Sequence, residues 1–238
     1  MQVRFFVITE ILIATYNIRH GVNIAGELAL DATASVLAQI DPQIISLQEV
    51  DCLRPRSDFV NQTAFLAQKL DMEYVFGASI RYHTGAYGNA ILSKLPIISS
   101  TNHLLPSIME SRACLEVKII IDNSILTVFN THLSLNNQER SRQLNDIILP
   151  LVMKQKNPAV LCGDFNAPDS AEEIKSAAKQ LQDTFKNNTG LIVNTYSAAD
   201  PQVRIDYIFI NSHCQCRSFY IVDSLASDHL PAVASISI

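Results

Sequence analysis

Short runs rich in β-branched and apolar residues recur along this chain. Strand-like runs occupy residues 11–17, 43–50, 74–80, 88–93, 97–104, 113–121, 124–131, 158–163, 203–210, 217–223 and 231–238. The run QIISLQEV at 43–50 is almost continuously apolar, which is typical of a strand buried on both faces. So many strands need two sheets, and helices can cover the outer faces. We therefore expect an α/β (α+β) fold, a four-layer αββα sandwich of two packed mixed β-sheets flanked by helices.

Helical spacing of apolar residues is limited to four stretches, at residues 27–40, 59–70, 138–155 and 170–182. Asp41-Pro42 should end the first helix, because the residue before a proline disfavours helical geometry. Ser170 and Glu173 have the spacing of a capping box at the start of the last helix.

Composition bounds the class of protein. Hydrophobic residues make up 48% of the 238 residues and charged residues 17%, which excludes intrinsic disorder. No window approaches the ~18 uncharged apolar residues of a spanning helix, so we expect no transmembrane segment. With no linker and no break in composition, we expect a single domain over residues 1–238, with 1–10 as a possible N-terminal extension.

Charge and cysteine content narrow the partners and the compartment. The net charge is −5 and both halves of the chain are slightly acidic, so the charge totals show no basic stripe of the kind that binds long nucleic acid, and a local basic patch stays open. Five cysteines, an odd number, do not indicate a disulfide framework. Glu10 interrupts the short apolar start and no cleavage site follows it, so we expect a cytoplasmic protein. The oligomeric state has no signature here.

Polar residues lie where apolar strands give way to turns, which is where sites are built because strand interiors must pack. The carboxylates there are Glu49, Asp164, Asp206 and Asp228, the amides are Asn17 and Asn166, and the imidazoles are His132 and His229. Carboxylate and amide oxygens without clustered thiols suit a hard cation, Mg²⁺ or Mn²⁺. Two histidines can act as general base and general acid near neutral pH. This set fits metal-assisted in-line attack of water on phosphorus.

Seven motifs carry a family resemblance. They are TYNIRHG (15–21), LQEVD (47–51), YGNAILSKLPI (87–97), NTHL (130–133), GDFNAP (163–168), RIDYIF (204–209) and SDHLPAVA (227–234). In this order they resemble the endonuclease/exonuclease/phosphatase superfamily, which includes pancreatic-type deoxyribonuclease, bacterial neutral sphingomyelinase and inositol polyphosphate 5-phosphatases. The resemblance spans residues 15–234.

The resemblance implies roles for individual residues. Glu49 resembles the metal-binding glutamate, Asn17 lies near the metal and the water in that pattern, and Asp228 lies beside the metal. Asp164 resembles the aspartate that orients or deprotonates the attacking water, and Asn166 resembles the asparagine that holds that water or the phosphate.

The same resemblance pairs His229 of the SDH motif with the carboxylate of Asp206. It places His132 on the leaving-group side and makes Asn89 a phosphate contact. Family members differ over whether the aspartate or a histidine is the base, so Asp164 and His229 both stay candidates. Arg112 opens an apolar strand, and its charge makes it a candidate for substrate binding.

Three functions stay open. The first is a Mg²⁺-dependent phosphoesterase that hydrolyses phosphodiester or phosphomonoester bonds of a small or lipid-derived phosphate. The second is an endonuclease or exonuclease on DNA or RNA, which requires a local basic groove. The third is a non-catalytic binding module. Specificity should lie in the loops at 19–29, 52–58, 81–88, 103–112 and 187–203, which carry no readable code.

Overall fold

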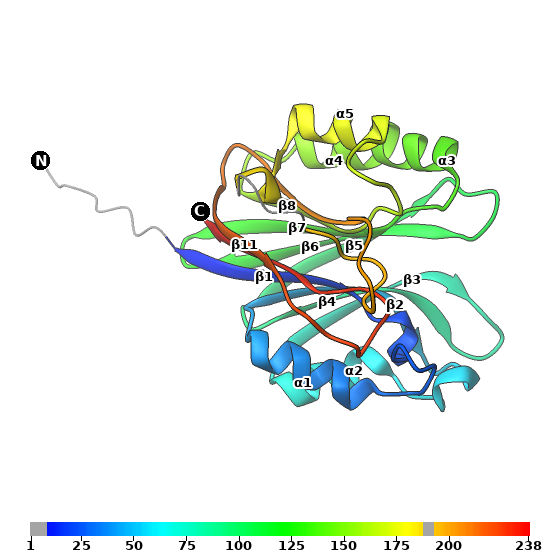
Figure 1. Ribbon diagram of the computed structural model, residues 1–238. Coiled ribbons are helices and arrows are strands. Elements are labelled where there is room, and N and C mark those ends of the chain that lie inside the picture. Colours follow the sequence, from blue (N-terminus) through cyan, green and yellow to red (C-terminus); the bar gives the residue numbers. More distant parts are fainter. Residues whose placement is uncertain (1–8, 188–192) are drawn as a thin grey trace, which may run out of the picture.

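Two six-stranded sheets packed face to face form the centre of the molecule (Figure 1). This computed structural model describes residues 9–187 and 193–238. The first sheet has the spatial order β11 (Gln215–Ile221), β12 (Ala232–Ser237), β1 (Glu10–Asn17), β2 (Ile44–Cys52), β4 (Ala86–Ser93) and β3 (Glu73–Arg81). The second has the order β5 (Ile97–Leu105), β6 (Arg112–Ile121), β7 (Ser124–His132), β8 (Ala159–Asp164), β10 (Asp206–Ile210) and β9 (Gln182–Asp183).

Helices cover both outer faces (Figure 1). The first sheet carries α1 (Leu30–Ile40) and α2 (Gln62–Leu70), and the second carries α3 (Asn137–Ser141), α4 (Leu149–Met153) and α5 (Glu172–Gln180). A π-helical segment, η3 (Arg142–Ile148), joins α3 to α4. Short 3₁₀ turns are η1 (Arg19–Gly21), η2 (Pro55–Ser57) and η4 (Thr184–Asn187). The expected four-layer αββα sandwich is confirmed, and no helix among the described residues is long and apolar enough to cross a bilayer.

Burial on both faces explains the apolar run at 43–50. Ile44 packs between the two sheets in the central core, whereas Ile45 and Leu47 pack on the opposite face beneath the helices. Successive side chains of a strand point to opposite faces. A strand between two packed layers therefore needs apolar residues at nearly every position.

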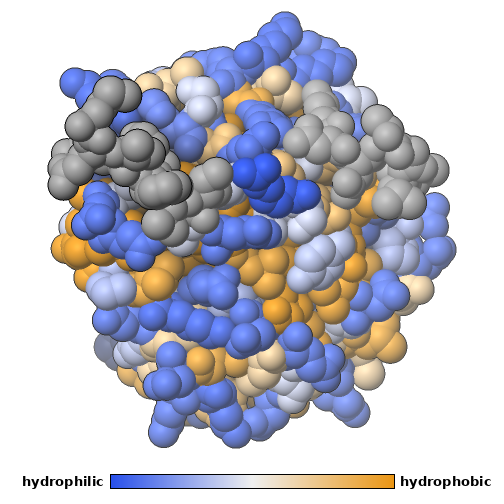
Figure 2. All heavy atoms as spheres, turned by 90° about the vertical axis from the view of Figure 1, so that its left-hand side faces the viewer, coloured by the Kyte–Doolittle hydropathy of each residue, from blue (hydrophilic) through white to orange (hydrophobic). Residues whose placement is uncertain are grey.

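Strand direction gathers the candidate residues at one end of the sandwich. β1 runs parallel to β2, and β7 runs parallel to β8, so the carboxyl ends of these strands lie together. β12 is antiparallel to β1 and β10 is antiparallel to β8, so their amino ends lie there too. The opposite end, where β1 begins, shows apolar side chains between hydrophilic ones (Figure 2). The candidate site therefore lies on the far side from that view.

Three details differ from the sequence expectations. The capping box is wrong: Ala171 is the N-cap of α5 and makes no side-chain cap bond, while Glu173 instead accepts a hydrogen bond from Arg140 Nε at 2.7 Å. The first helix begins at Leu30 rather than at residue 27. The helix expected over 138–155 is divided by the π-helical segment. Residues 1–8 of the predicted extension, and 188–192 of the last predicted loop, lie outside the described residues.

Candidate active site

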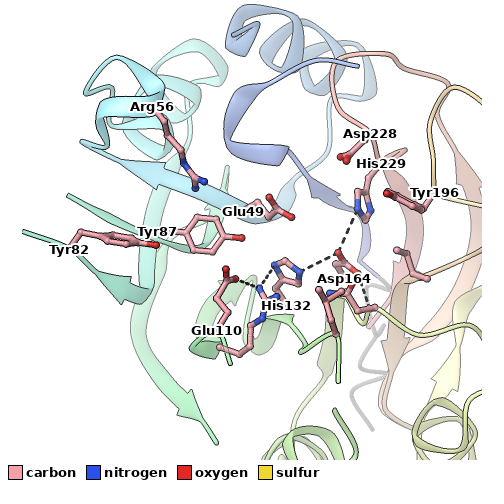
Figure 3. Close-up of a pocket in the computed structure, with 14 residues that line it drawn as sticks. Glu49, Arg56, Tyr82, Tyr87, Glu110, His132, Asp164, Tyr196, Asp228 and His229 are labelled. Atoms are coloured by element: carbon pink, nitrogen blue, oxygen red, sulfur yellow. Dashed lines mark hydrogen bonds and ion pairs between the residues drawn. The ribbon is translucent and has the colours of Figure 1, made fainter. Parts of the chain in front are cut away.

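A pocket of about 420 Å³ opens at the end of the sandwich where these strand ends meet (Figure 3). It is lined by residues from both sheets and their loops: Glu49, Arg56, Tyr82, Tyr87, Glu110, Arg112, His132, Leu135, Asp164, Asn166, Tyr196, Ile205, Asp228 and His229. Seven of these were predicted as site residues from the sequence, namely Glu49, Arg112, His132, Asp164, Asn166, Asp228 and His229.

Asp164 lies at the centre of the site. Its Oδ2 accepts a hydrogen bond from Asn17 Nδ2 at 3.0 Å, and it lies 3.5 Å from His132 Nε2 and 3.7 Å from His229 Nε2. Burial raises the pKa of Asp164 to about 7, although the positive charge of His229 opposes this. A carboxylate with a pKa near neutrality is suited to take a proton from water.

Gly163 sets this position of Asp164. A Cβ on Gly163 would collide with the carbonyl oxygen of Thr131 on β7, and its φ is +141°. Only glycine therefore lets β8 approach β7 closely enough at this point. The close packing of β8 against β7 therefore explains the glycine of the GDFN string.

His229 and Asp206 form a buried pair. His229 Nδ1 lies 2.9 Å from Asp206 Oδ2, and since an ionised carboxylate only accepts, Nδ1 carries the proton. Burial by itself lowers the pKa of His229, but the charges of Asp206 and Asp164 outweigh it and raise this pKa to about 10. The ring of Tyr196 lies 4.9 Å from the His229 ring and covers it. The partnership expected between Asp206 and His229 is present in the geometry.

Glu49 lies in a β-bulge of β2, with a left-handed φ of +56°. Such backbone strain in a non-glycine residue is concentrated at functional sites, and here the bulge redirects the side chain into the pocket. Asn17 Nδ2 donates to Glu49 Oε1 at 3.1 Å, and His20 Nδ1 lies 3.8 Å from Oε2. Burial alone would raise the pKa of Glu49, but these neighbours lower it to about 2. Glu49 is therefore charged at neutral pH.

Asn166 also adopts a left-handed conformation, with φ +49°. Its backbone N–H donates to Asp164 Oδ1 at 2.8 Å, and its side-chain Nδ2 donates to the carbonyl oxygen of Leu133 at 2.9 Å. Asn166 thus fixes the orientation of the Asp164 carboxylate. Asp228 faces the pocket, with Oδ2 3.5 Å from Arg19 Nε.

His132 and Arg112 contact each other at the opposite wall. Arg112 Nη1 lies 3.1 Å from His132 Nδ1 and 2.8 Å from Glu110 Oε1. Burial and then the charge of Arg112 lower the pKa of His132 to about 3. His132 is therefore neutral at neutral pH, unlike His229.

Two predicted roles do not match the orientation of the side chains. Asn17 Oδ1 accepts from the backbone N–H of Arg19 at 3.0 Å, so its amide N–H groups rather than its oxygen face Glu49 and Asp164. Asn89 is buried and donates to the carbonyl oxygen of Ala113, and it does not line the pocket. In this conformation Asn17 orients two carboxylates, and Asn89 joins the two sheets. The ligand role of Asn17 and the phosphate contact of Asn89 stay predictions.

Several pocket residues escaped the sequence analysis. Arg56, Tyr82, Tyr87, Glu110, Leu135, Tyr196 and Ile205 line the pocket, and His20 contacts Glu49. Most of them lie in the loops where specificity was expected. The available signals were membership of the motifs: His20 lies in TYNIRHG, Tyr87 opens YGNAILSKLPI, and Ile205 lies in RIDYIF.

The donors in the pocket fit a hard divalent cation. Glu49 and Asp228 offer carboxylate oxygens on one side of the pocket, and Glu49 is held ionised. Asp164, Asp206 and His229 form a second group whose candidate ligand atoms lie within 4.8 Å of one another. In this second group His229 and Asp206 already bond each other at 2.9 Å. Glu49 and Asp228 are the better candidates to hold Mg²⁺ or Mn²⁺.

Comparison with curated proteins gives relatives over part of their length. The chain is 30% identical over 168 residues to Protein cwh43 of Schizosaccharomyces pombe, covering 70% of this chain and 16% of that protein. It is 26% identical over 154 residues to the uncharacterized protein YbhP of Escherichia coli K12, covering 62% of this chain and 60% of YbhP. The chain thus spans less than two thirds of the length of either relative.

Solved structures share the fold. An endonuclease/exonuclease/phosphatase from Beutenbergia cavernae superposes with a TM-score of 0.81 at 20% identity, covering 96% of this chain and 72% of the other. One from Bacteroides vulgatus gives 0.80 at 21% identity, with 96% and 98% covered. The human Nocturnin catalytic domain, solved with a bound sulfate anion, gives 0.74 at 20% identity, with 95% and 93% covered. At these identities the likeness establishes the architecture only.

The sequence pattern of the Endonuclease/Exonuclease/phosphatase family matches residues 14–229, from β1 to the histidine of the Asp206–His229 pair. This match includes every candidate residue described above. By this match over nearly its whole length, the chain belongs to the endonuclease/exonuclease/phosphatase family.

Proposed function

We propose that this protein is a divalent-metal-dependent phosphoesterase that hydrolyses an ester of a small or lipid-derived phosphate. The observation that carries the proposal is the convergence of Asn17, His132 and His229 on one oxygen of Asp164. Members of the superfamily are typically hydrolases of phosphate esters and generally depend on a divalent metal. The identity of the metal, the substrate and the activity of this chain belong to the proposal.

In the proposed reaction, Asp164 accepts a proton from the attacking water. Its pKa of about 7 leaves a large share of the carboxylate able to do so at neutral pH. Asn17 and the backbone N–H of Asn166 keep the two oxygens in place. His229, held by Asp206, presents Nε2 to the same space and is the second candidate for the base, but its raised pKa keeps it protonated at neutral pH, so only its minor neutral form could accept the proton. A cation held by Glu49 and Asp228 would supply positive charge to the phosphoryl oxygens.

The charges around the pocket favour a compact phosphate ester over a long nucleic acid. Among its lining residues, Arg56 is bound to Asp51 through two hydrogen bonds and Arg112 is paired with Glu110. Both arginine charges are therefore already compensated, whereas nucleic-acid binding draws its affinity from cations free to meet phosphates.

Leu135 in the pocket wall, together with the exposed Ile108 and Met109 just before the lining residue Glu110 (the apolar rim), favours a substrate with an apolar portion. Among the described residues, the most exposed large hydrophobics are Ile108 (85%), Met109 (81%), Leu135 (76%) and Leu104 (69%). Leu135 lines the pocket, and Ile108 N–H donates to Glu139 of α3, which ties its loop to the segment that follows Leu135. Contiguous exposed apolar residues beside a site mark a binding surface.

The test compares wild type with Asp164→Asn and His229→Gln on four substrates: a soluble bis-aryl phosphodiester, a short-chain phospholipid, plasmid DNA and a short RNA. We expect turnover of the small or lipid esters with Mg²⁺ or Mn²⁺, none with chelator, and a loss of roughly 10²–10⁴ in each variant. Asp169→Asn and His213→Gln, both exposed, are the matched controls and should retain wild-type rates.

Other outcomes would support other functions. Turnover of DNA or RNA alone, falling steeply with salt, would support the nuclease. No turnover on any substrate, with no Mg²⁺ or Mn²⁺ binding, would support a binding module, whereas metal binding that is lost in Glu49→Ala would indicate an enzyme with a narrower substrate. A cytoplasmic location is part of the proposal and is tested by imaging the tagged protein.

A further inference from the structure

We propose that Arg112 is a positioning residue that locks His132 as a neutral imidazole with its proton on Nε2. In this form His132 donates a hydrogen bond to the substrate and does not give up a proton. What His132 does to the substrate rests on the proposed phosphoesterase function, whereas the locked tautomer is a property of the protein alone.

The contact is buried and specific. Arg112 begins β6, its side chain is only 7% exposed, and its Nη1 lies 3.1 Å from Nδ1 of His132 at the end of β7. The two residues lie on neighbouring strands, where Cys114 pairs with Thr131. Glu110 Oε1 lies 2.8 Å from the same Nη1 and pairs with the guanidinium. The geometry therefore fixes the partner of Nδ1 of His132.

The chemistry of the two groups selects the tautomer. A guanidinium has five N–H donors and no acceptor, so the nitrogen that meets it must offer a lone pair. Nδ1 of His132 is therefore unprotonated, and the one proton of the neutral ring is on Nε2. Nε2 lies 3.5 Å from Asp164 Oδ2, on the pocket side. The N–H of His132 consequently faces the place where a substrate oxygen would lie.

The two histidines of the site are thus fixed in opposite ways. His229 meets a carboxylate, which holds a proton on Nδ1, and its raised pKa keeps the ring charged at neutral pH; His132 meets a guanidinium and keeps its single proton on Nε2. The charged or titratable groups that act on His132 are Arg112, Asp164, Glu49 and His229. The pKa of about 3 agrees with a ring that stays neutral through the physiological range.

A neutral donor has a different use from a general acid. If neutral His132 gave its Nε2 proton to a leaving oxygen, it would become an anionic imidazolate beside Asp164, which is unfavourable in a buried site. Held as it is, His132 can stabilise developing negative charge on an oxygen through a hydrogen bond that needs no rearrangement. No bond is made or broken at His132. This replaces the leaving-group acid that the family resemblance implies.

The experiment is ¹⁵N NMR of histidine side chains at pH 7, with Mg²⁺ and with chelator, using His132→Gln to assign the His132 signals. Wild type should show an unprotonated Nδ1 and a protonated Nε2. Arg112→Met should give a mixture of tautomers and move protonation of His132 to higher pH. Arg112→Lys retains a donor-only cation and should restore the wild-type tautomer. Arg217→Met, on β11 in the other sheet, is the control for loss of an arginine charge and should match wild type.

The kinetic readout follows from the same variants. Arg112→Met should lower kcat/KM roughly ten- to hundredfold, which is the range for a residue that orients a functional histidine without contacting the substrate. Arg112→Lys should restore kcat/KM. The pH profile of Arg112→Met should gain a second acid limb, from protonation of His132, beside the limb that Asp164 already gives the wild type.

A proton on Nδ1 of His132 in wild type, or an unchanged tautomer in a folded Arg112→Met variant, would overturn the lock. Because the spectra need no substrate, an inactive protein with the locked tautomer would count against the proposed function and not against Arg112.

Discussion

Replacing Asp206 by Asn should remove most of the activity while keeping the fold. Asp206 is fully buried, and its Oδ2 is the partner of His229 Nδ1 at 2.9 Å. Asparagine has the same shape without the charge. The Asp206 charge is the largest contribution that raises the pKa of His229, so this pKa of about 10 should fall in the variant. An amide N–H turned toward Nδ1 would also move the ring proton to Nε2.

The size of the effect follows from two contributions. A hydrogen bond to a charged group contributes about 1.5–3 kcal/mol, and about 1.4 kcal/mol is a factor of ten, so the lost pair alone gives roughly ten- to hundredfold. The misplaced proton adds to this, which brings the expected loss in kcat/KM to about 10²–10⁴. The variant should still fold, but urea unfolding at neutral pH should show reduced stability, because the buried charge pair that raises the pKa of His229 is lost.

The assay measures kcat/KM from pH 5 to 9 on a chromogenic phosphodiester, and urea unfolding of the same samples. Asp223→Asn, an exposed carboxylate beyond β11, is the matched control. If folded Asp206→Asn kept kcat/KM within about threefold of wild type across this range, the pair would not serve catalysis and the reasoning would fail.

Four further predictions concern metal, pH, packing and the rim. Glu49→Gln should weaken Mg²⁺ binding measured by calorimetry, and unchanged affinity would exclude Glu49 as a ligand. The raised pKa of His229 means that its stabilising contribution is complete below about pH 6.5 and is lost toward pH 10. The unfolding free energy of the metal-free protein should therefore fall above pH 7 by up to about 1.4 kcal/mol per pH unit. The Asp206→Asn variant, which lacks the charge that raises this pKa, is the control and should show a flat profile. Asn130→Leu leaves the carbonyl oxygens of Leu47 and Ala90 without their hydrogen-bond donor. It should lower the free energy of unfolding in urea by about 2–4 kcal/mol. The double variant Ile108→Asn, Met109→Asn should lower turnover of the phospholipid but not of the soluble diester. An equal loss on both substrates would show that these residues do not bind an apolar portion of the substrate.

The sheets could be predicted from the sequence because a strand between two layers needs apolar residues on both faces. Residues 43–50 and 158–163 show this directly, and each became a central strand of its sheet. The carboxylates were predictable for a related reason. Glu49 and Asp164 interrupt or end such strands, where a charge has no place unless it reaches a pocket or a partner.

The capping box shows where local pattern fails. Ser170 and Glu173 have the right spacing, yet Glu173 pairs with Arg140 of α3, which lies 33 positions earlier in the chain. A buried ion pair with a residue so distant outweighs a local cap bond. The spacing of residues along the sequence gives no sign of such a partner. The pocket residues in the specificity loops could not be predicted for the same reason, because Arg56, Tyr82 and Glu110 come together only around the pocket of the folded chain.

The sequence by itself determined which residues are present for the chemistry: Glu49, Asp164, Asp206 and His229 each stand beside a strand end in a recognisable order. The tertiary structure decided how each one is held. It turned the amide of Asn17 so that N–H groups face the carboxylates, and it directed Asn89 to a backbone carbonyl. It also set the proton of His132 through Arg112, twenty positions earlier. Residue type fixes what a side chain can donate or accept, but its partner is chosen by strands that meet only once the chain has folded.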